Sequence, residues 1–427
     1  MGIITRTSHV RSAALLAALL SVPALTVPAL AVPAGADAPP AGPTREESRL
    51  DAPVPREILR RGGFDREAPE FAAALARTRT ARQAERLTAE TGRRLWRRAV
   101  DRAQGRGPVR GDLPRDDDRP LYWARVGLTR ALREWRPSFP LPAERRAALL
   151  DGLERGSRGQ DSVAFPAGRG IKRVLVTGFD PFRLDDDVRR SNPSGASALA
   201  LDGTTVNTPS GPARIEAAVF PVRWDDFARG TVERTLLPHF RPGPHRVDLF
   251  TTISQGRPGR FDLERTNGAW RGSGTDNEGL RRGPAPVPVR QHPQPQWTRT
   301  TLPYAVLASA ATGPYPVHDN TSVTEIPAGG TDPVERPDGP TPGSAARAGG
   351  GGDYLSNEIA YRATLLRDAL RLRVPGGHLH TPVLQFADDN GPAGGRVTDP
   401  KFERSRRAIV AQVRAVLGVA AGTVRRG

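Results

Sequence analysis

The apolar residues in the first part of the chain recur at helical spacing, three or four positions apart. This pattern predicts helices over residues 55–165, interrupted by the proline-rich stretch 137–142 and resuming around 144–153. The positions that carry it are Phe71, Leu75, Leu87, Leu95, Trp96, Leu121, Trp123, Val126, Leu128, Leu132 and Trp135. We interpret this arginine-rich region as a docking or folding appendage, or alternatively as a separate binding module. We expect the rest of the chain to fold without it.

From residue 171 onward, short apolar runs alternate with amphipathic stretches. The apolar runs predict strands at 173–177, 214–222, 247–254 and 377–385. The amphipathic stretches predict helices at 193–201, 225–237, 302–311, 355–372 and 402–417. Such alternation predicts an α/β domain over residues 171–427: a three-layer, open, mostly parallel sheet with helices on both faces. Functional loops of such sheets lie at the carboxyl ends of the strands.

Two segments have a composition that favours disorder. Residues 39–54 are rich in Pro and Ala and are expected to form a flexible leader. Residues 329–352 are a low-complexity Gly/Pro/Ala stretch, which we expect to be a disordered surface insertion.

The first 38 residues have the features of an export signal. Arg6 and Arg11 precede an apolar run over 13–30, and Ala-x-Ala cleavage sites occur at 29–31 and 36–38. Prolines interrupt the run, and no later stretch is long and apolar enough for a membrane span. The sequence therefore predicts a secreted, extracytoplasmic protein.

The lack of cysteine and the excess of arginine limit the kinds of site that this chain can form. The chain contains no cysteine, which excludes disulfides, thiolate metal sites and thiol nucleophiles. Its net charge of +17 is almost entirely due to arginine, since the only lysines are Lys172 and Lys401. The arginines are scattered and accompany no nucleic-acid-binding motif, so no specific nucleic-acid partner is expected. Binding of an anion or of cell-wall material through the helical region stays a weaker alternative.

Short motifs then follow one another in a fixed order. The first strand runs into Gly-Phe-Asp-Pro-Phe at 178–182 and then Ser-Asn-Pro-Ser at 191–194. Further motifs are Phe-Pro-Val at 220–222, Trp-Asp at 224–225, Gly-Arg at 256–257, Glu-Arg at 264–265, Asp-Asn-Glu-Gly at 276–279, Thr-Leu-Pro at 301–303, Ser-Asn at 356–357 with Tyr361, and Gly-His-Leu-His-Thr-Pro at 377–382. In this order the motifs resemble those of the pyroglutamyl peptidase I family. The resemblance covers residues 171–427 and says nothing of residues 1–170.

The resemblance implies a catalytic set. The family uses a cysteine, a histidine and a glutamate, which fall here on Ser356, His380 and Glu264. The residues agree with such roles: Ser356 begins a helix, whose N-terminus stabilises an oxyanion, and a histidine oriented by a carboxylate is a general base. A hydroxyl needs neutral His380 within hydrogen-bonding distance, whereas a thiol ionises readily.

Simpler interpretations of these residues stay open. Ser356 could be a helix N-cap, and Glu264 could form a surface ion pair with Arg265. His378 and His380 share one strand face, as metal ligands can, but no third ligand is apparent. We therefore expect neither a metal nor another cofactor.

The resemblance also implies a substrate site. Phe179, Phe182 and Tyr354 occupy the places of the aromatic side chains that enclose the pyroglutamyl ring, and Gln255 that of a glutamine bonded to the ring amide. The chain departs from the family in the spacing from Gly-Arg to Glu264 and in extra residues over 271–276. The implied function is removal of N-terminal pyroglutamate from peptides through an acyl-enzyme on Ser356. The alternative is an inactive relative that binds blocked peptide N-termini or another ligand. A homo-oligomer is possible in either case.

Overall fold

A computed structural model describes residues 42–424, apart from 109, 167–169, 291–293 and 393–394. The described residues belong to one compact unit, which extends over 37–427. The expected export signal at 1–38 and the first residues of the expected leader lie outside the described residues. Among the described helices, none is long and apolar enough to cross a bilayer.

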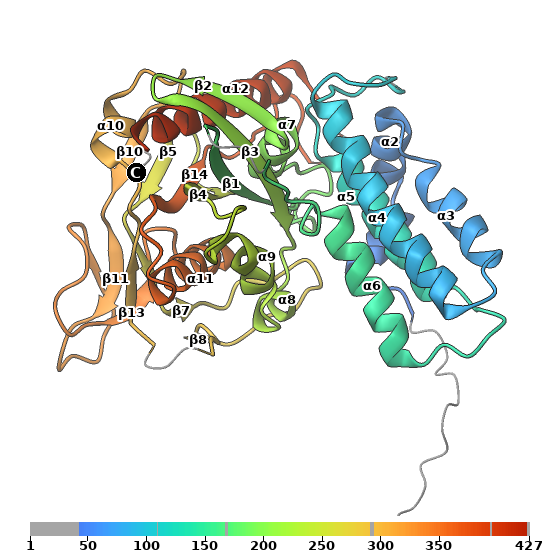
Figure 1. Ribbon diagram of the computed structural model, residues 1–427, viewed down its shortest axis with the longest axis horizontal. Helices are drawn as coiled ribbons and strands as arrows, with labels where there is room; N and C mark the ends of the chain where they lie inside the picture. The colour runs from blue at the N-terminus through green and yellow to red at the C-terminus, as the bar shows by residue number, and fades with distance from the viewer. Residues whose placement is uncertain (1–41, 109, 167–169, 291–293, 393–394, 425–427) are drawn as a thin grey trace, which may run out of the picture. The chain divides into compact units, whose positions relative to one another are not determined.

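The centre of the molecule is a seven-stranded sheet in the order β10-β5-β14-β4-β1-β3-β2 (Figure 1). Its strands are β1 (Lys172–Phe179), β2 (Thr204–Thr208), β3 (Gly211–Phe220), β4 (Leu249–Gln255), β5 (Phe261–Glu264), β10 (Val317–Asn320) and β14 (Gly376–Thr381). β1 pairs in parallel with β3 and β4, β14 with β4, and β10 with β5. Only β5 against β14 and β2 against β3 are antiparallel within this sheet. The predicted fold class, a mostly parallel sheet with helices on both faces, is confirmed.

Helices cover both faces of the sheet because its central strands are apolar on both sides. Along β1, Val174 and Val176 join one buried cluster and Leu175 joins the other, as the two-residue period of a strand requires. The first cluster lies under α7 (Pro193–Leu201), α10 (Tyr304–Ser309) and α12 (Pro400–Thr423). The second lies under α8 (Trp224–Ala228), α9 (Thr231–Phe240) and α11 (Leu355–Ala369).

The turn after β1 depends on a glycine. A Cβ at Gly178 would clash with the backbone carbonyl of Ser194 in α7, so only glycine permits this close approach. Asn192 then begins α7: its Oδ1 accepts from Ser194 N at 3.1 Å, and its Nδ2 donates to Asp180 O at 2.9 Å. The motif at 191–194 thus stabilises the turn that contains the first motif, Gly-Phe-Asp-Pro-Phe at 178–182.

The helical region consists of α1 (Arg45–Ser48), the 3-10 turn η1 (Arg49–Asp51), α2 (Pro53–Gly62), α3 (Glu67–Ala76), α4 (Ala81–Ala103), α5 (Arg119–Glu134) and α6 (Ala143–Ser157). It shares a buried apolar cluster with α7 and α12. Trp96 Nε1 donates to Asp202 Oδ2 at 3.0 Å, and Asp118 accepts from Asn192 N at 2.9 Å and from the Ser191 hydroxyl. The region is therefore packed into the α/β part, and folding of residues 171–427 without it stays a prediction.

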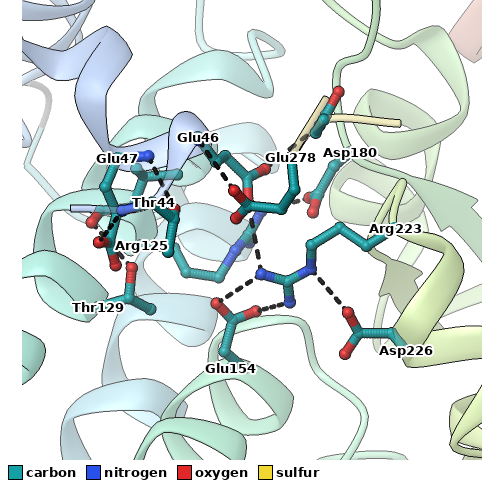
Figure 2. Close-up of polar contacts among 12 residues, drawn as sticks. Thr44, Glu46, Glu47, Arg125, Thr129, Glu154, Asp180, Arg223, Asp226 and Glu278 are labelled. Carbon is teal, nitrogen blue, oxygen red and sulfur yellow. Dashed lines mark hydrogen bonds and ion pairs between the residues drawn. The ribbon is translucent and has the colours of Figure 1, made fainter. Parts of the chain in front are cut away.

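Partly buried ion pairs also join the two regions (Figure 2). Arg223, which follows β3, donates to Glu154 of α6 at 2.7 Å and pairs with Glu46 of α1 at 3.4 Å and with Asp226 at 2.8 Å. Burial raises the pKa of Glu46, against the lowering effect of Arg223. Contacts of this kind tie the beginning of the chain to the loops of the sheet.

The expectation of a flexible leader is wrong for the described residues 42–54. Thr44 and Glu47 form a capping box at the start of α1, with Thr44 N donating to Glu47 Oε2 at 3.0 Å. Glu46 and Glu47 are both buried. Tyr122 OH donates to Glu46 Oε1 at 2.6 Å, and Arg133 donates to Glu47 Oε2 at 3.0 Å. Hydrogen bonds from Tyr122 and Arg133 to these buried carboxylates hold the segment in place, and composition alone does not reveal such contacts.

The expectation that residues 329–352 are disordered is also wrong. They contain β12 (Val334–Arg336) and β13 (Ala345–Ala348), which pair on either side of β11 (Val323–Ile326). The carboxylate of buried Glu325 accepts from Thr341 N at 2.6 Å and from Arg336 Nε at 2.9 Å. One buried carboxylate thus organises a segment with few apolar residues. The remaining short strands are β6 (Thr266–Gly268) with β9 (Trp297–Arg299), and β7 (Trp270–Arg271) with β8 (Ala285–Pro286).

Candidate active site

Neighbouring strands bring His380 and Glu264 together. His380 lies in β14 and Glu264 in the antiparallel β5, and His380 Nδ1 is 2.7 Å from Glu264 Oε1. An ionised carboxylate can only accept, so this contact requires a proton on Nδ1, and in the neutral imidazole Nε2 is then the acceptor. Arg265 instead pairs with Asp319 at 2.5 Å, so the interpretation of Glu264 as its surface partner is wrong.

Asn320 holds the other oxygen of Glu264. It lies at the end of β10, in register with Glu264, and its Nδ2 donates to Glu264 Oε2 at 2.7 Å. The same amide donates to the carbonyl of Gly350 at 3.2 Å. Asn320 is not among the residues predicted from the sequence. Its contacts fix the Glu264 carboxylate, and they connect it to the glycine turn before α11.

Ser356 lies in the first turn of α11. Its Oγ donates to Gly351 O at 3.0 Å, and within the described structure no hydrogen bond joins it to His380. The N-cap of α11 is Tyr354, so the interpretation of Ser356 as a helix cap is wrong. A Cβ at Gly351 would lie 3.1 Å from His380 Cε1, so Ser356 and His380 both adjoin this glycine. The first N–H groups of a helix have no intrahelical acceptor and can face an anion.

Buried polar contacts fix the start of α11. Asn357 Nδ2 donates to Gly268 O at 2.9 Å, and Asn357 Oδ1 accepts from Gly268 N at 2.9 Å. Glu358, fully buried, accepts from Arg271 at 2.6 Å and from Arg362 at 2.9 Å. These contacts hold the backbone on either side of Asn357, next to Ser356, in a defined position.

A cavity of about 620 Å³ contains the three predicted catalytic residues. Phe182 and Tyr354 lie on its wall with ring centroids 6.1 Å apart and planes inclined by 28°. Tyr354 is held by its hydroxyl, which donates to Thr275 O at 2.9 Å, so the extra residues at 271–276 support the ring. Gln255, at the end of β4, also lines the cavity, and its buried Oε1 has no hydrogen-bond partner among the described residues.

Phe179 is placed differently from the other predicted substrate-binding residues. It is buried and stacks on Phe227, with centroids 6.0 Å apart and planes inclined by 10°. It lines a small hollow with Phe182, Gln255 and Tyr354 rather than the main cavity. Phe179 therefore supports the floor of the site.

The sequence comparisons agree over most of the chain. The family model described as PA0049 N-terminal domain matches residues 29–154, and the model described as PA0049, C-terminal domain matches 173–294 and 315–385. The uncharacterized protein PA0049 of Pseudomonas aeruginosa is 37% identical over 487 aligned residues, covering 87% of this chain and 88% of that protein. The chain belongs to the PA0049 family.

Solved structures are similar to part of this PA0049 family member. A mutant pyrrolidone carboxyl peptidase from the hyperthermophile Pyrococcus furiosus is 21% identical, with a TM-score of 0.42, covering 59% of this chain and 100% of that one. Pyroglutamyl peptidase I from Bacillus amyloliquefaciens is 18% identical, with a TM-score of 0.37, covering 59% of this chain and 96% of that one.

The region matched by the PA0049 N-terminal model also reaches the cavity. Arg49 lines it, donating to Asp185 Oδ1 at 2.9 Å and to Asn277 O at 2.6 Å. Its partner Asp185 follows closely after Phe182. The helical region therefore contributes a residue to the cavity and contacts the loop that follows Phe182, which the motif order did not indicate.

His378 is a structural neighbour of the site in this PA0049 family member. Its ring nitrogens are 2.8 Å from Thr252 Oγ1 and 2.9 Å from Ser254 Oγ, and burial holds its pKa well below the usual range, with nearby His380 acting in the same direction. Its ring meets that of His380 edge to face at 4.7 Å. The described residues contain no group of three His, Asp or Glu side chains suited to a metal ion.

Proposed function

We propose that this protein is a serine amidohydrolase that removes N-terminal pyroglutamate from peptides. The observation that carries the proposal is the His380–Glu264 hydrogen bond of 2.7 Å at the wall of a cavity that also contains Ser356. We also propose that the mature protein acts outside the cytoplasm after removal of the segment 1–38. Its substrate would be a peptide with a blocked N-terminus, and no cofactor takes part in the reaction.

Acylation follows from the proton positions. Ser356 Oγ attacks the carbonyl carbon of the pyroglutamyl amide while His380 Nε2 takes the hydroxyl proton. Glu264 keeps the Nδ1 proton in place and stabilises the imidazolium. Backbone N–H groups at the start of α11 would bind the oxyanion. His380 then protonates the leaving amine, the acyl-enzyme forms, and a water activated by His380 releases pyroglutamate and restores Ser356.

Three side chains suit the lactam ring. Phe182 and Tyr354 present aromatic faces inclined by only 28°, which can cover the two faces of a flat, neutral ring after a small separation. The unpartnered Oε1 of Gln255 can accept the lactam N–H. A buried acceptor without a donor is costly, and a ligand with a matching N–H removes this cost.

One observation favours a second candidate, an inactive protein that binds blocked peptide ends. Ser356 Oγ donates to Gly351 O at 3.0 Å instead of to the histidine. For catalysis the Ser356 side chain must turn away from this carbonyl and toward Nε2 of His380. If the backbone prevents that rotation, ring binding can persist without turnover.

The deciding experiment is an assay of the purified mature chain with a fluorogenic pyroglutamyl amide. We expect turnover that Ser356→Ala and His380→Ala each abolish, without additivity in the double variant, because the two groups act as a unit. Calorimetric titration with a pyroglutamyl peptide amide should show that Ser356→Ala still binds. Binding without turnover in the wild type would favour the second candidate, and neither binding nor turnover would overturn both.

The proposal of export has its own test. Mass spectrometry of protein recovered from the medium of a bacterial host should show a chain that begins after residue 31 or 38. Recovery of the protein only from the cytoplasm, with Met1 present, would contradict export.

A further inference from the structure

A second hollow, of about 400 Å³, lies in the helical region and shares no lining residue with the active-site cavity. One face of α4 and the segments before and after it surround the hollow. Six guanidinium groups line it, those of Arg94, Arg97, Arg98, Arg102, Arg106 and Arg110. Asp101 is the only carboxylate among its lining residues.

Few of these charges are neutralised. Arg106 pairs with Asp101 at 2.8 Å, and Arg98 pairs with Glu67. Arg102 donates to three backbone carbonyls, those of residues 113 and 115 at 2.8 Å each and that of residue 117 at 3.4 Å. The guanidinium groups of Arg94, Arg97 and Arg110 form no ion pair within the described structure. Among the residues that the structure describes, four guanidinium groups of the hollow thus have no carboxylate partner.

The spacing of these arginines destabilises α4 when the helix is considered by itself. Arg94, Arg98 and Arg102 follow one another at intervals of four residues on α4, a spacing at which like charges destabilise a helix. The guanidinium of Arg98 is also fixed over the ring of Phe64, 4.6 Å from its centroid. An anion in the hollow would offset the repulsion between groups that the fold holds together.

Guanidinium groups recognise oxyanions in particular. Their planar N–H pairs match the oxygen spacing of phosphate and sulfate and bind them more strongly than they bind chloride. A volume of about 400 Å³ is within the range of small-molecule sites and exceeds the needs of a single simple ion. We propose that this hollow binds a doubly or multiply charged oxyanion of the phosphate or sulfate class, carried by a small molecule or by a lipid headgroup.

The test uses the full mature chain and inorganic pyrophosphate as probe. We expect pyrophosphate to raise the melting temperature more than sodium chloride of equal ionic strength, because it binds the folded state at one site. Calorimetry should show binding that the double variant Arg94→Gln/Arg97→Gln weakens by about tenfold or more. The matched control is Arg82→Gln/Arg86→Gln, which removes the same charge from exposed positions of α4 outside the hollow. It should bind like the wild type.

Vesicles distinguish the two sources of the anion. Binding to phosphatidylglycerol vesicles but not to phosphatidylcholine vesicles, lost in the Arg94/Arg97 variant and kept in the control, would identify a headgroup. Pyrophosphate binding without vesicle binding would identify a soluble ligand. The proposal is overturned if pyrophosphate stabilises no more than chloride, or if both double variants weaken binding equally. The latter result would mean that only net charge matters. Turnover of the pyroglutamyl substrate bears on neither outcome.

Discussion

Replacing Asp180 tests whether the helical region and the sheet form one cooperative unit. Asp180 follows β1 directly and is 3% exposed. It pairs with Arg158 at 2.8 Å and also with Arg125, both from the helical region and both buried. Asp180→Asn keeps the shape of the side chain but removes its charge, so Arg125 loses its only carboxylate partner in the described structure.

The size of the effect follows from burial. Removing one member of a buried ion pair costs about 3–5 kcal/mol, because the other charge stays desolvated and uncompensated. Arg158 keeps Glu154, so most of the cost falls on Arg125. Burial already lowers the pKa of the Arg125 guanidinium, and nearby Arg158 adds to this effect. Arg125→Met in the Asp180→Asn background removes the unpaired charge, and it should recover about half of the loss or more.

Urea unfolding measures both variants. We expect Asp180→Asn to lower the free energy of unfolding by about 3–5 kcal/mol, in a single transition seen alike by circular dichroism and tryptophan fluorescence. The reasoning fails if the loss is below about 1 kcal/mol, or if Arg125→Met adds to the damage instead of reducing it. Two separate transitions would show that the two regions unfold independently despite their shared core.

Three further predictions concern the site and its support. Ser356→Cys should raise pyroglutamyl peptidase activity and make it sensitive to alkylating reagents, which should not affect the cysteine-free natural chain. A Ser356→Cys variant that binds substrate but does not turn it over would show that the site lacks the geometry for catalysis. Gly350→Ala should lower kcat about a hundredfold, because the new methyl group clashes with Glu264 Oε2, whereas Gly283→Ala, which meets nothing within 4 Å, should leave kcat unchanged. Burial, reinforced by neighbouring Asp117, raises the pKa of Asp118 to about 6, so the folded state binds a proton that the unfolded chain releases near the ordinary pKa of 3.8. The stability that Asp118 contributes is therefore present below about pH 4 and lost as pH rises through 6. Urea titrations between pH 4 and 7.5 should show this decline in the wild type and a smaller one in Asp118→Asn.

Local signals in the sequence identified the parts of the site that lie on regular elements. The apolar run of β1 and the proline that opens α7 gave the strand and the helix 193–201 with its observed bounds. Motif order brought Glu264 and His380 into one site, and the structure joins them by a hydrogen bond. Asn320 had no such signal, because its role arises from the parallel pairing of β10 with β5, between residues 56 positions apart.

Composition failed as a guide where single polar groups organise a segment. Residues 329–352 have little apolar surface, yet three hydrogen bonds to the Glu325 carboxylate from Arg336 and Thr341 hold the loop between β12 and β13. The same holds for Glu46 near the start of the chain, which accepts from Tyr122 of α5. The donors lie 11 to 76 positions away in sequence, so no local pattern reveals them.

Whether the protein catalyses the reaction or only binds its substrate depends on whether the Ser356 hydroxyl can reach His380. The strength of its hydrogen bond to Gly351 O sets the cost of that rotation. A hydrogen bond to a backbone carbonyl contributes about 0.5–1.5 kcal/mol, so turning Ser356 away from Gly351 O lowers the rate only about two- to tenfold. Glu264, supported by Asn320, already fixes the His380 tautomer that an attacking hydroxyl requires. An inactive site would therefore require that the turned hydroxyl still fall short of Nε2. That is a backbone property which Ser356→Cys tests directly, because the larger sulfur extends farther toward the histidine.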